Sequence, residues 1–554
     1  MKKLILLFFL FIIVFTSFSQ EVDATLPVSW SNDFREQNKS EITPIVLPAL
    51  DLETIIAEDS INDLDKSLPW RYGISRPLQL DFENHGEWTN LPSGGRIWRI
   101  AIKSPDAINL SINFDDFHLP TGARLHLYND DHTDISKTYS NAQNRANKLL
   151  GSWYISGDVI LVEYYEPSSS SGSLNLVIGS VIHGYRMGQV RQYVTRGLND
   201  SGACNYDVNC PIGSDFDSKK DILKKAVALL NLGNGYLCST TLINTTLNNK
   251  TPYLLTANHC LENSDPSFWS VRFNWMSPSP ICASEEESLD IQTNFTMSGA
   301  EIISNNATSD FALVKLFNNI PFSWDVSFAG WDNTDDIPDF EVGIHHPNGD
   351  IMKICRDDSG AVRENANGTD VWLIGGTSVG TGDGWEIGTT ESGSSGSPLF
   401  NEEGRIIGQL YAGQSSCNGT QDNNDYDIYG RFGVSWNVGN SPQTRLMEWL
   451  DPNGSGQTTT ETIQNVLSTI EFDVLGSLDI YPNPASSAIS IINGMYPNLS
   501  YNFYNVLGQK ILSGSLSNTI NEINVESLKE GIYFLYLVDK ASDADITKKI
   551  IIER

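Results

Sequence analysis

Segments in which apolar and polar residues alternate recur along most of this chain. In the N-terminal third, residues 96–102 and 109–114 alternate in this way, and further strand-like runs lie at 123–128 and 159–165. A two-residue period puts successive side chains on opposite faces of a half-buried strand, and turn-forming residues separate the runs at regular spacing. The pattern predicts a β-sandwich within residues 21–198.

The same pattern returns at the C-terminus, after a polar stretch at 456–474 that is typical of a linker. Strand-like runs at 478–485, 501–510, 528–538 and 548–552 predict a separate sandwich of about seven strands over residues 475–554. In the middle of the chain, apolar runs predict strands at 254–257, 311–316 and 405–410. A helix is predicted over 441–450, because Pro442 lies near its first turn and Asp-Pro-Asn-Gly follows it.

The first twenty residues have the pattern of a secretory signal peptide. Lys2 and Lys3 precede an apolar run at 4–14, and small or polar residues follow at 16–20. A membrane anchor is the alternative, but the apolar run is short for a span, and no other segment approaches spanning length. We expect cleavage near Gln20 and no membrane span in the mature protein.

Length, net charge and residue content limit the number of domains, the class of partner and the fold class. A chain of 554 residues predicts roughly three or four domains. Its net charge of −32 argues against nucleic acid or anionic membrane as a partner, and favours a soluble exported protein that attracts basic substrates. The content of Gly, Asn, Ser, Thr and aromatic residues predicts mostly β structure.

A serine between glycines is the first sign of chemistry. Residues 390–400 read TESGSSGSPLF, which places Ser395 in a tightly turning loop of small residues. The backbone N–H groups of Gly393 and Ser395 can then converge where a tetrahedral intermediate carries its negative oxygen, forming an oxyanion hole. A Ser-Gly linker is the plainer interpretation of this stretch alone.

Two further residues supply the partners that such a serine needs. His259 ends the apolar run in LLTANHC, and Asp310 opens the apolar run in SDFALVKL. A serine hydroxyl is a weak nucleophile until a base accepts its proton, so His259 is expected to act as base and then as acid, with Asp310 holding its tautomer. The chain order His259, Asp310, Ser395 is that of the chymotrypsin group.

With these motifs together, the chain resembles trypsin-fold serine endopeptidases, and most of all the bacterial lysyl endopeptidases. The matching blocks are TANHC, SDFALVKL, GSSGSP, GQLYAGQSSC and DIYGR, in this order over residues 199–455. The resemblance implies a mostly β, chymotrypsin-like double antiparallel β-barrel with six strands in each barrel. His259 and Asp310 would lie on the first barrel and Ser395 on the second.

The resemblance also implies a specificity for lysine. The trypsin group carries its pocket acid six residues before the serine, where this chain has Thr389. Lysyl endopeptidases use an aspartate two residues before Tyr-Gly-Arg, which nominates Asp427 as a substrate-binding residue. A single carboxylate suits the point charge of an ammonium. Asp427 lies in the polar run QDNNDYD, for which a solvated or calcium-binding loop is the alternative. Tyr411 stands where the family has a histidine beside the pocket.

All seven cysteines lie between 204 and 417, and export favours disulfides, but their spacing does not choose among the possible pairings. The family resemblance implies the pairs Cys204–Cys417, Cys210–Cys282 and Cys238–Cys260, and leaves Cys355 as a free buried thiol. The pair His345-His346 suggests zinc, but no carboxylate lies at ligand spacing, and the family has a similar run in its scaffold. We expect no cofactor and no metal.

Since the lysyl endopeptidases begin near their first cysteine, residues 21–198 are expected to be a propeptide that assists folding or covers the active site. A permanent carbohydrate- or protein-binding module is the alternative. Arg186, Arg191 and Arg196 mark plausible processing points. In chymotrypsin a freed N-terminal amine pairs with an aspartate before the serine, but Ser394 occupies that position here. Activation is therefore expected to occur by removal of a cover.

The C-terminal blocks YPNPA, LGQK, GIYFLYL and KKIII resemble the sorting domain of the type IX secretion system in Bacteroidetes. The resemblance implies that this Ig-like β-sandwich engages the secretion machinery and leads to release or attachment at the outer-membrane surface; a generic Ig-like binding module is the alternative.

Taken together, these features lead us to expect a secreted precursor of a serine endopeptidase that acts on proteins or peptides. The competing class is a surface adhesin or binding protein with an inactive peptidase domain.

Overall fold

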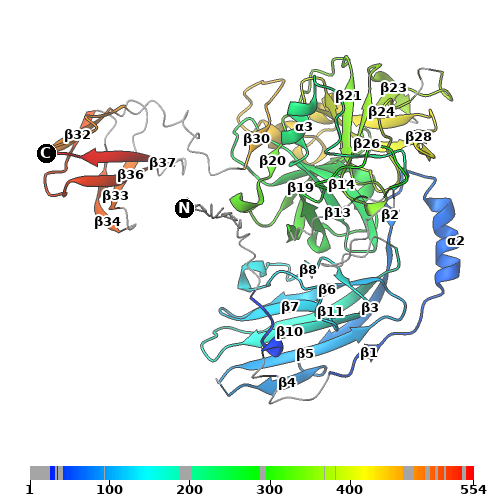
Figure 1. Ribbon diagram of the computed structural model, residues 1–554, viewed down its shortest axis with the longest axis horizontal. Helices are drawn as coiled ribbons and strands as arrows, with labels where there is room; N and C mark the ends of the chain where they lie inside the picture. The colour runs from blue at the N-terminus through cyan, green and yellow to red at the C-terminus, as the bar shows by residue number, and fades with distance from the viewer. Residues whose placement is uncertain are drawn as a thin grey trace, which may run out of the picture. The chain divides into compact units, whose positions relative to one another are not determined.

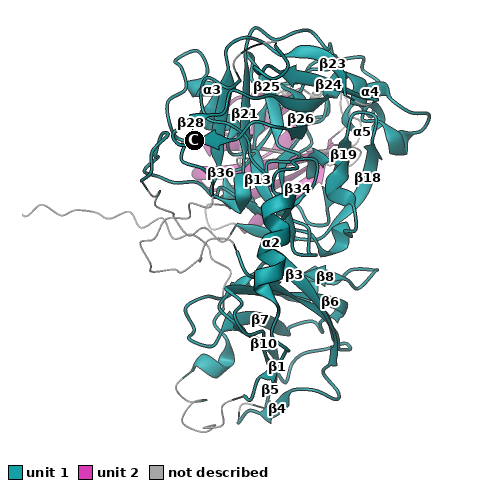
Figure 2. Ribbon diagram, turned by 90° about the vertical axis from the view of Figure 1, so that its right-hand side faces the viewer, with its two compact units in different colours: residues 1–465 teal, residues 466–554 magenta. Residues whose placement is uncertain are grey.

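The computed structural model describes residues 25–186, 201–465 and 479–554. Within these ranges residues 32–33, 35–41, 93, 287, 289–294, 367, 381, 383, 493–498, 506–508, 517–519 and 540–544 are not described. The chain forms two compact units, Met1–Asn465 and Val466–Arg554 (Figure 2). The signal peptide, the processing points at Arg191 and Arg196, and residues 466–474 of the expected linker lie outside the described residues.

The predicted N-terminal sandwich is present as two five-stranded sheets that face each other (Figure 1). The first sheet contains β1 (Ile45–Val46), β4 (Glu87–Asn90), β5 (Arg96–Lys103), β7 (Arg124–Asn129) and β10 (Val159–Glu166). The second contains β3 (Gly73–Asp81), β6 (Asn109–His118), β8 (Leu150–Gly151), β9 (Ile155–Ser156) and β11 (Asn175–Gly184). Alternating side chains such as Trp98, Phe114 and Tyr164 are fully buried in its core.

Residues 201–465 are built around two further sheets. The first contains β2 (Trp70–Arg71), β13 (Val227–Asn231), β14 (Tyr236–Leu242), β15 (Tyr253–Ala257), β16 (Ser270–Phe273), β17 (Thr296–Ser298), β18 (Ala300–Asn306) and β19 (Phe311–Leu316). The second contains β12 (Tyr206–Asp207), β21 (Glu341–His345), β22 (Lys353–Asp357), β23 (Val362–Ala366), β24 (Thr369–Ile374), β25 (Pro398–Asn401), β26 (Ile406–Gly413) and β29 (Asp427–Arg431). Mostly β structure is thus confirmed.

Each of these sheets has eight strands instead of the expected six. In the first sheet the difference includes β2, which comes from the N-terminal half of the chain and pairs antiparallel with β14. An expectation drawn from residues 199–455 alone could not include that strand. The two short ladders are β20 (Ser327–Phe328) with β30 (Ile463–Gln464), and β27 (Cys417–Asn418) with β28 (Gln421–Asp422).

Helices are short. The α-helices are α2 (Leu52–Asn62), α3 (Asp217–Leu223), α4 (Phe432–Asn437) and α5 (Met447–Leu450). The 3₁₀ turns are η1 (Val28–Trp30), η2 (Asn141–Gln143), η3 (Asn258–Leu261), η4 (Pro266–Phe268), η5 (Phe322–Trp324), η6 (Pro347–Gly349) and η7 (Pro442–Thr444). The single helix predicted over 441–450 is wrong. It is divided into η7 and α5, because Arg445 between them is extended, with φ −153° and ψ 167°.

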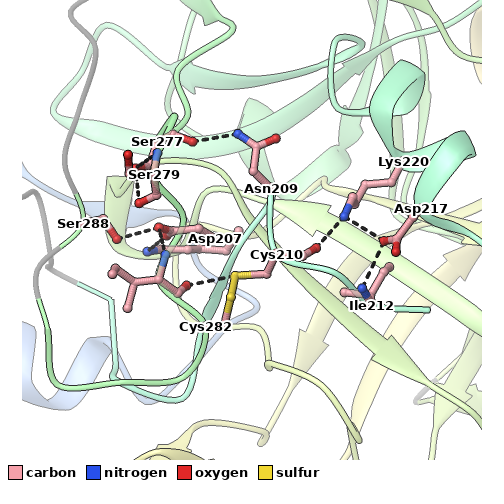
Figure 3. The surroundings of a disulfide bond; sticks show 12 residues. Asp207, Asn209, Cys210, Ile212, Asp217, Lys220, Ser277, Ser279, Cys282 and Ser288 are labelled. Atoms are coloured by element: carbon pink, nitrogen blue, oxygen red, sulfur yellow. Dashed lines mark hydrogen bonds and ion pairs between the residues drawn. A yellow bond between two sulfur atoms is a disulfide. The ribbon is translucent and has the colours of Figure 1, made fainter. Parts of the chain in front are cut away.

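The three disulfides join the pairs that the family resemblance implied, Cys204–Cys417, Cys210–Cys282 and Cys238–Cys260, and Cys355 is a buried thiol. Figure 3 shows the surroundings of Cys210–Cys282. Beside this bond the buried carboxylate of Asp207 accepts hydrogen bonds from the Ile281 amide and the Ser288 hydroxyl, and forms an ion pair with Lys353.

The first compact unit continues past residue 455, where the peptidase region was expected to end. Strand β30 pairs with β20, and the Asn465 side chain donates a hydrogen bond to the carbonyl of Ile320. The segment up to Asn465 is thus attached to the sheets by backbone and side-chain bonds, which its polar sequence did not indicate.

The second unit is a small sandwich by itself. One sheet contains β31 (Asp479–Tyr481), β32 (Ala488–Ile492) and β35 (Ile520–Asn524), and the other contains β33 (Leu499–Asn505), β34 (Lys510–Ser515), β36 (Gly531–Asp539) and β37 (Asp545–Ile552). Apolar side chains including Ile489, Phe503 and Leu535 fill the space between them. In the described part of the chain, no helix is both long and apolar enough to cross a membrane.

Replacing Cys210 and Cys282 together by alanine should lower the free energy of unfolding by about 4 kcal/mol, because the bond closes a long loop in the unfolded chain. The bond spans 72 residues. Urea unfolding followed by tryptophan fluorescence measures this loss. Cys355→Ala is the control for deleting a buried sulfur alone. A double variant that loses no more stability than this control would contradict the prediction.

Candidate active site

The strand pairing of the first eight-stranded sheet brings His259 and Asp310 together. Strand β15 ends at Ala257 opposite Phe311, the first residue of β19. His259 follows β15 in the turn η3, and Asp310 immediately precedes β19. Residues that are distant in sequence therefore meet at the same end of two antiparallel strands. The disulfide Cys238–Cys260 further ties this turn to β14.

His259 and Asp310 form a buried pair that is joined by two hydrogen bonds. The Nδ1 atom of His259 lies 2.8 Å from Oδ2 of Asp310, and the backbone N–H of His259 donates to Oδ1 at 3.0 Å. Asp310 has a φ of 51°, an uncommon conformation for a residue with a side chain, which is held by the hydrogen bond from the Asn258 amide to its carbonyl. Nε2 of His259 is buried and makes no hydrogen bond within the described residues.

The loop that carries Ser395 is hydrogen-bonded to an inner strand of each eight-stranded sheet. The Ser239 amide on β14 donates to the Ser395 carbonyl at 2.8 Å, and the Gly396 amide donates to Leu410 on β26. Gly396 has a φ of 81°, and a Cβ there would lie 2.1 Å from Oγ1 of Thr256. A glycine is thus required where the serine loop crosses β15. Gly393 has a φ of 91°, which favours glycine, and a Cβ there would make a tight contact of 3.0 Å with the Asn348 amide.

Neutral hydrogen bonds hold this loop from behind. The Ser394 hydroxyl lies 2.8 Å from Nδ1 of His345, which is fully buried. Burial lowers the pKa of His345 well below its usual value, so its ring is neutral. His346 is also buried, with its pKa lowered to about 3, and its Nδ1 bonds to the Asp350 carbonyl. The expected scaffold position of this histidine pair agrees with these contacts.

Asp427 is buried beside the serine loop, and the residues around its carboxylate are here called the Asp427 pocket. Oδ2 of Asp427 accepts hydrogen bonds from Nε1 of Trp385 at 2.8 Å, Oγ1 of Thr390 at 2.7 Å and Oγ of Ser415 at 2.5 Å. Gly413 lines the same space, since a Cβ on it would lie 1.9 Å from Oδ1 of Asp427. Asp427 has no exposed surface, yet one of its oxygens is left for a further donor.

That donor comes from the N-terminal half of the same chain. Nζ of Lys66 bonds to Oδ1 of Asp427 at 2.8 Å, to Oγ1 of Thr390 at 2.9 Å and to Oγ of Ser415 at 2.8 Å. The Lys66 carbonyl accepts a hydrogen bond from Oγ of Ser395 at 3.1 Å. Three residues earlier, the Asp63 carbonyl accepts one from Oγ of Ser392 at 2.9 Å. The site therefore holds a lysine side chain in its pocket and the same lysine's carbonyl at its serine.

The remaining predicted residues lie close to this arrangement. Tyr411 is half-buried, with its ring centroid 6.2 Å from that of His259. Thr389 is buried but does not contact Asp427, whereas its neighbour Thr390 does. Cys238, His259 and Cys260 are near enough to one another to bind a metal, but both sulfurs are used in a disulfide. This leaves one imidazole, which is too few ligands for a metal site.

Four residues of this site were missed from the sequence: Trp385, Thr390, Gly413 and Ser415. Nothing in their local sequence distinguishes them, because they become pocket residues only when β24, β26 and β29 pair. Lys66 had a detectable signal, since it is the only lysine between Lys39 and Lys103 and follows a stretch rich in aspartate and glutamate. An isolated lysine predicts a pocket ligand only after a pocket that binds lysine has been found in the structure.

Two family models and a curated relative match this chain. Residues 198–430 match the family model of the lysyl endopeptidase C-terminal domain, and residues 479–553 match that of the secretion system C-terminal sorting domain. A lysyl endopeptidase of Pseudomonas aeruginosa is 26% identical over 359 residues, covering 61% of this chain and 74% of the relative.

A solved structure of PorZ, a surface component of the type IX secretion system of Porphyromonas gingivalis, matches with 8% identity and a TM-score of 0.13. It covers 58% of this chain, which spans 31% of that protein, and this likeness carries no argument. The two family-model matches and the lysyl endopeptidase relative do support a conclusion. The chain resembles the lysyl endopeptidases, a peptidase family, and carries a type IX sorting domain that marks it as secreted or attached to the cell surface.

Proposed function

We propose that this chain is the precursor of a secreted serine endopeptidase that cleaves peptide bonds on the carboxyl side of lysine. The observation that carries the proposal is Lys66, whose ammonium group occupies the Asp427 pocket while its carbonyl lies 3.1 Å from Oγ of Ser395. A peptidase specific for lysine binds a substrate in this way, with the side chain before the cleaved bond in a selective pocket.

The pocket chemistry favours lysine over arginine. An ammonium group has three N–H donors, and Asp427, Thr390 and Ser415 supply three oxygens within 2.9 Å of Nζ. A guanidinium group is planar and has five donors, so it would leave some of them buried without acceptors. The indole of Trp385 bonds to Asp427 and packs against Tyr429, which closes the pocket behind the carboxylate. The longer arginine side chain therefore has no space to extend.

We propose the following reaction for these residues. Ser395 Oγ attacks the carbonyl carbon, and Nε2 of His259 accepts its proton. Asp310 holds Nδ1 protonated and stabilises the imidazolium that forms. The backbone N–H groups of Gly393 and Ser395 are proposed to bind the oxyanion. His259 then protonates the leaving amine, and water hydrolyses the resulting ester. Tyr411, beside the His259 ring, is proposed to border the substrate cleft.

The domain assignment is part of this proposal. Residues 21–198 act as a propeptide, residues 199–455 with the attached segment to Asn465 act as the peptidase domain, and the C-terminal unit directs export. Ser201 and Gly202, near the expected mature N-terminus, already bond to Asp350 and Glu391 in the uncut chain. Insertion of a new N-terminal amine beside Ser394 is thus unnecessary, which supports activation by removal of the propeptide.

The first experiment is a digest of a denatured protein of known sequence by the processed secreted enzyme and by its Ser395→Ala variant. Every cut is mapped by mass spectrometry. We expect cuts after lysine alone and none with the variant, because Ser395 supplies the nucleophile. Cuts after both lysine and arginine would contradict the proposed lysine specificity and leave the proposed mechanism in place. Absence of cutting by the processed enzyme would favour the binding-protein alternative.

A second test measures kcat/KM for matched lysyl and arginyl peptide esters. The lysyl ester should react much faster, and Asp427→Asn should cost about 3 kcal/mol of transition-state binding, on the order of a hundredfold in kcat/KM, because it removes a buried charge partner. Asp422→Asn, in the same polar run but outside the pocket, is the matched control. Equal rates for the two esters, or equal losses in the two variants, would contradict the assignment of Asp427.

A third test fills the pocket instead of removing the charge of Asp427. Gly413→Ala puts a methyl group where it would lie 1.9 Å from Oδ1 of Asp427, so lysine can no longer reach the carboxylate. We expect kcat/KM for the lysyl ester to fall at least tenfold, with KM bearing most of the change. Reaction of the variant with a small active-site acylating agent that lacks a basic group shows whether Ser395 is still competent. Unchanged lysyl ester hydrolysis would place the pocket elsewhere.

A further inference from the structure

The segment 63–70, here called the strap, crosses the active site as a substrate would. Lys66 fills the pocket, and the Lys66–Ser67 bond lies at Ser395. Before this bond, the Asp63 carbonyl is bound by Ser392. After it, Trp70 and Arg71 form β2 and pair with Leu237 and Tyr236 of β14. The peptidase domain thus grips the strap on both sides of one peptide bond.

Contacts within the N-terminal half also join the two sides of this bond. Oδ1 of Asp65 accepts hydrogen bonds from the amide and the hydroxyl of Ser67, at 3.0 and 2.5 Å. The carboxylate of the residue before Lys66 therefore holds the nitrogen that leaves when the bond breaks.

Ion pairs and hydrogen bonds of two arginines also join the segments on the two sides of the Lys66–Ser67 bond. Nε of Arg71, downstream of the bond, lies 2.7 Å from the buried carboxylate of Asp59 on α2, upstream of it. Arg186, at the end of the sandwich, pairs with Asp63 and donates from Nε to the Arg71 carbonyl. Figure 1 shows α2 at one side of the unit, on the path of the chain from β1 to β2.

The upstream part of the chain is itself fastened to the sandwich. Strand β1 pairs with β5 at Ile45 and Val46, and Arg76 donates to the Pro48 carbonyl. The Ser29 amide bonds to the Glu163 carboxylate. A cut after Lys66 would therefore leave the two fragments associated through a strand ladder, ion pairs and core contacts.

We propose that the Lys66–Ser67 bond is a cleavage site for the chain's own Ser395, and that the cut strap stays in place and keeps the site closed. This proposal rests on the proposed function. Oγ of Ser395 bonds to the Lys66 carbonyl carbon, the C–N bond to Ser67 breaks, and the serine proton passes through His259 to the Ser67 nitrogen. Water then releases Lys66 as a carboxylate, or the retained Ser67 amine attacks the ester and restores the peptide bond.

Retention of the amine decides between these outcomes. A free peptide loses its leaving group to solvent, whereas Asp65, Arg71 and the β2–β14 ladder keep the Ser67 amine beside the ester at high effective concentration. Bond re-formation then competes with hydrolysis, and the strap behaves as a reversible inhibitor. The cleaved fraction should reach a plateau below completion.

The test uses the full-length secreted precursor. Samples taken over time are denatured in acid and analysed by mass spectrometry for fragments that end at Lys66 and begin at Ser67. We expect a plateau of cleavage in the unchanged chain, none in Ser395→Ala, and co-elution of the fragments in native gel filtration. Hydrolysis of a small lysyl ester by the precursor should rise at least tenfold in Lys66→Gln. Lys103→Gln, which removes an ion-paired lysine of the sandwich, is the matched control and should change nothing.

Two variants weaken the contacts across the Lys66–Ser67 bond without touching the catalytic residues. In Asp65→Ala, an exposed position, and in Arg71→Gln, the Ser67 amine is held less firmly, so cleavage should approach completion and ester hydrolysis should rise. Complete cleavage with full activity in the unchanged precursor would overturn the proposal, as would an intact Lys66–Ser67 bond in a chain whose Lys66→Gln variant hydrolyses the ester. If processed enzyme free of the strap hydrolyses no lysyl ester, the proposed function itself fails.

Discussion

The cost of burying a carboxylate governs the organisation of this site. Asp310 and Asp427 lie almost wholly out of water, where an ionised group is stable only if it is paired and hydrogen-bonded. Asp310 meets this requirement with the ring and the amide of His259. Asp427 meets it with three neutral donors and the ammonium group of Lys66. Under the proposed function, one carboxylate orients the base and the other selects the side chain that enters.

The two halves of the first compact unit are joined through the same interactions. Lys66 belongs to the N-terminal half and Asp427 to the peptidase sheets, and the strand β2 extends a sheet whose other members lie beyond residue 226. The strand pairing fixes the direction of the strap, and the ion pair fixes its position along the cleft. Neither contact alone would place the Lys66 carbonyl at Ser395.

Much of this could be anticipated from sequence, because the signals were local. Apolar alternation located β5, β6, β7 and β10, and the short motifs around His259 and Asp310 identified two residues that the structure brings into contact. The extended Arg445 that divides the predicted helix, and the pocket residues Trp385 and Thr390, could not be anticipated. Their positions depend on contacts between strands that are far apart in the chain, and alternation carries no information about such contacts.

Because the strap is part of the same polypeptide as the pocket it fills, its local concentration does not depend on how dilute the protein is. A separate inhibitor would dissociate when the protein passes from the cell into a large outside volume, whereas a tethered one would not. Once the covalent connection between the two halves is severed, the same contacts become bimolecular, and dilution then favours the open enzyme. Under the proposed function, export to the exterior would therefore itself contribute to activation.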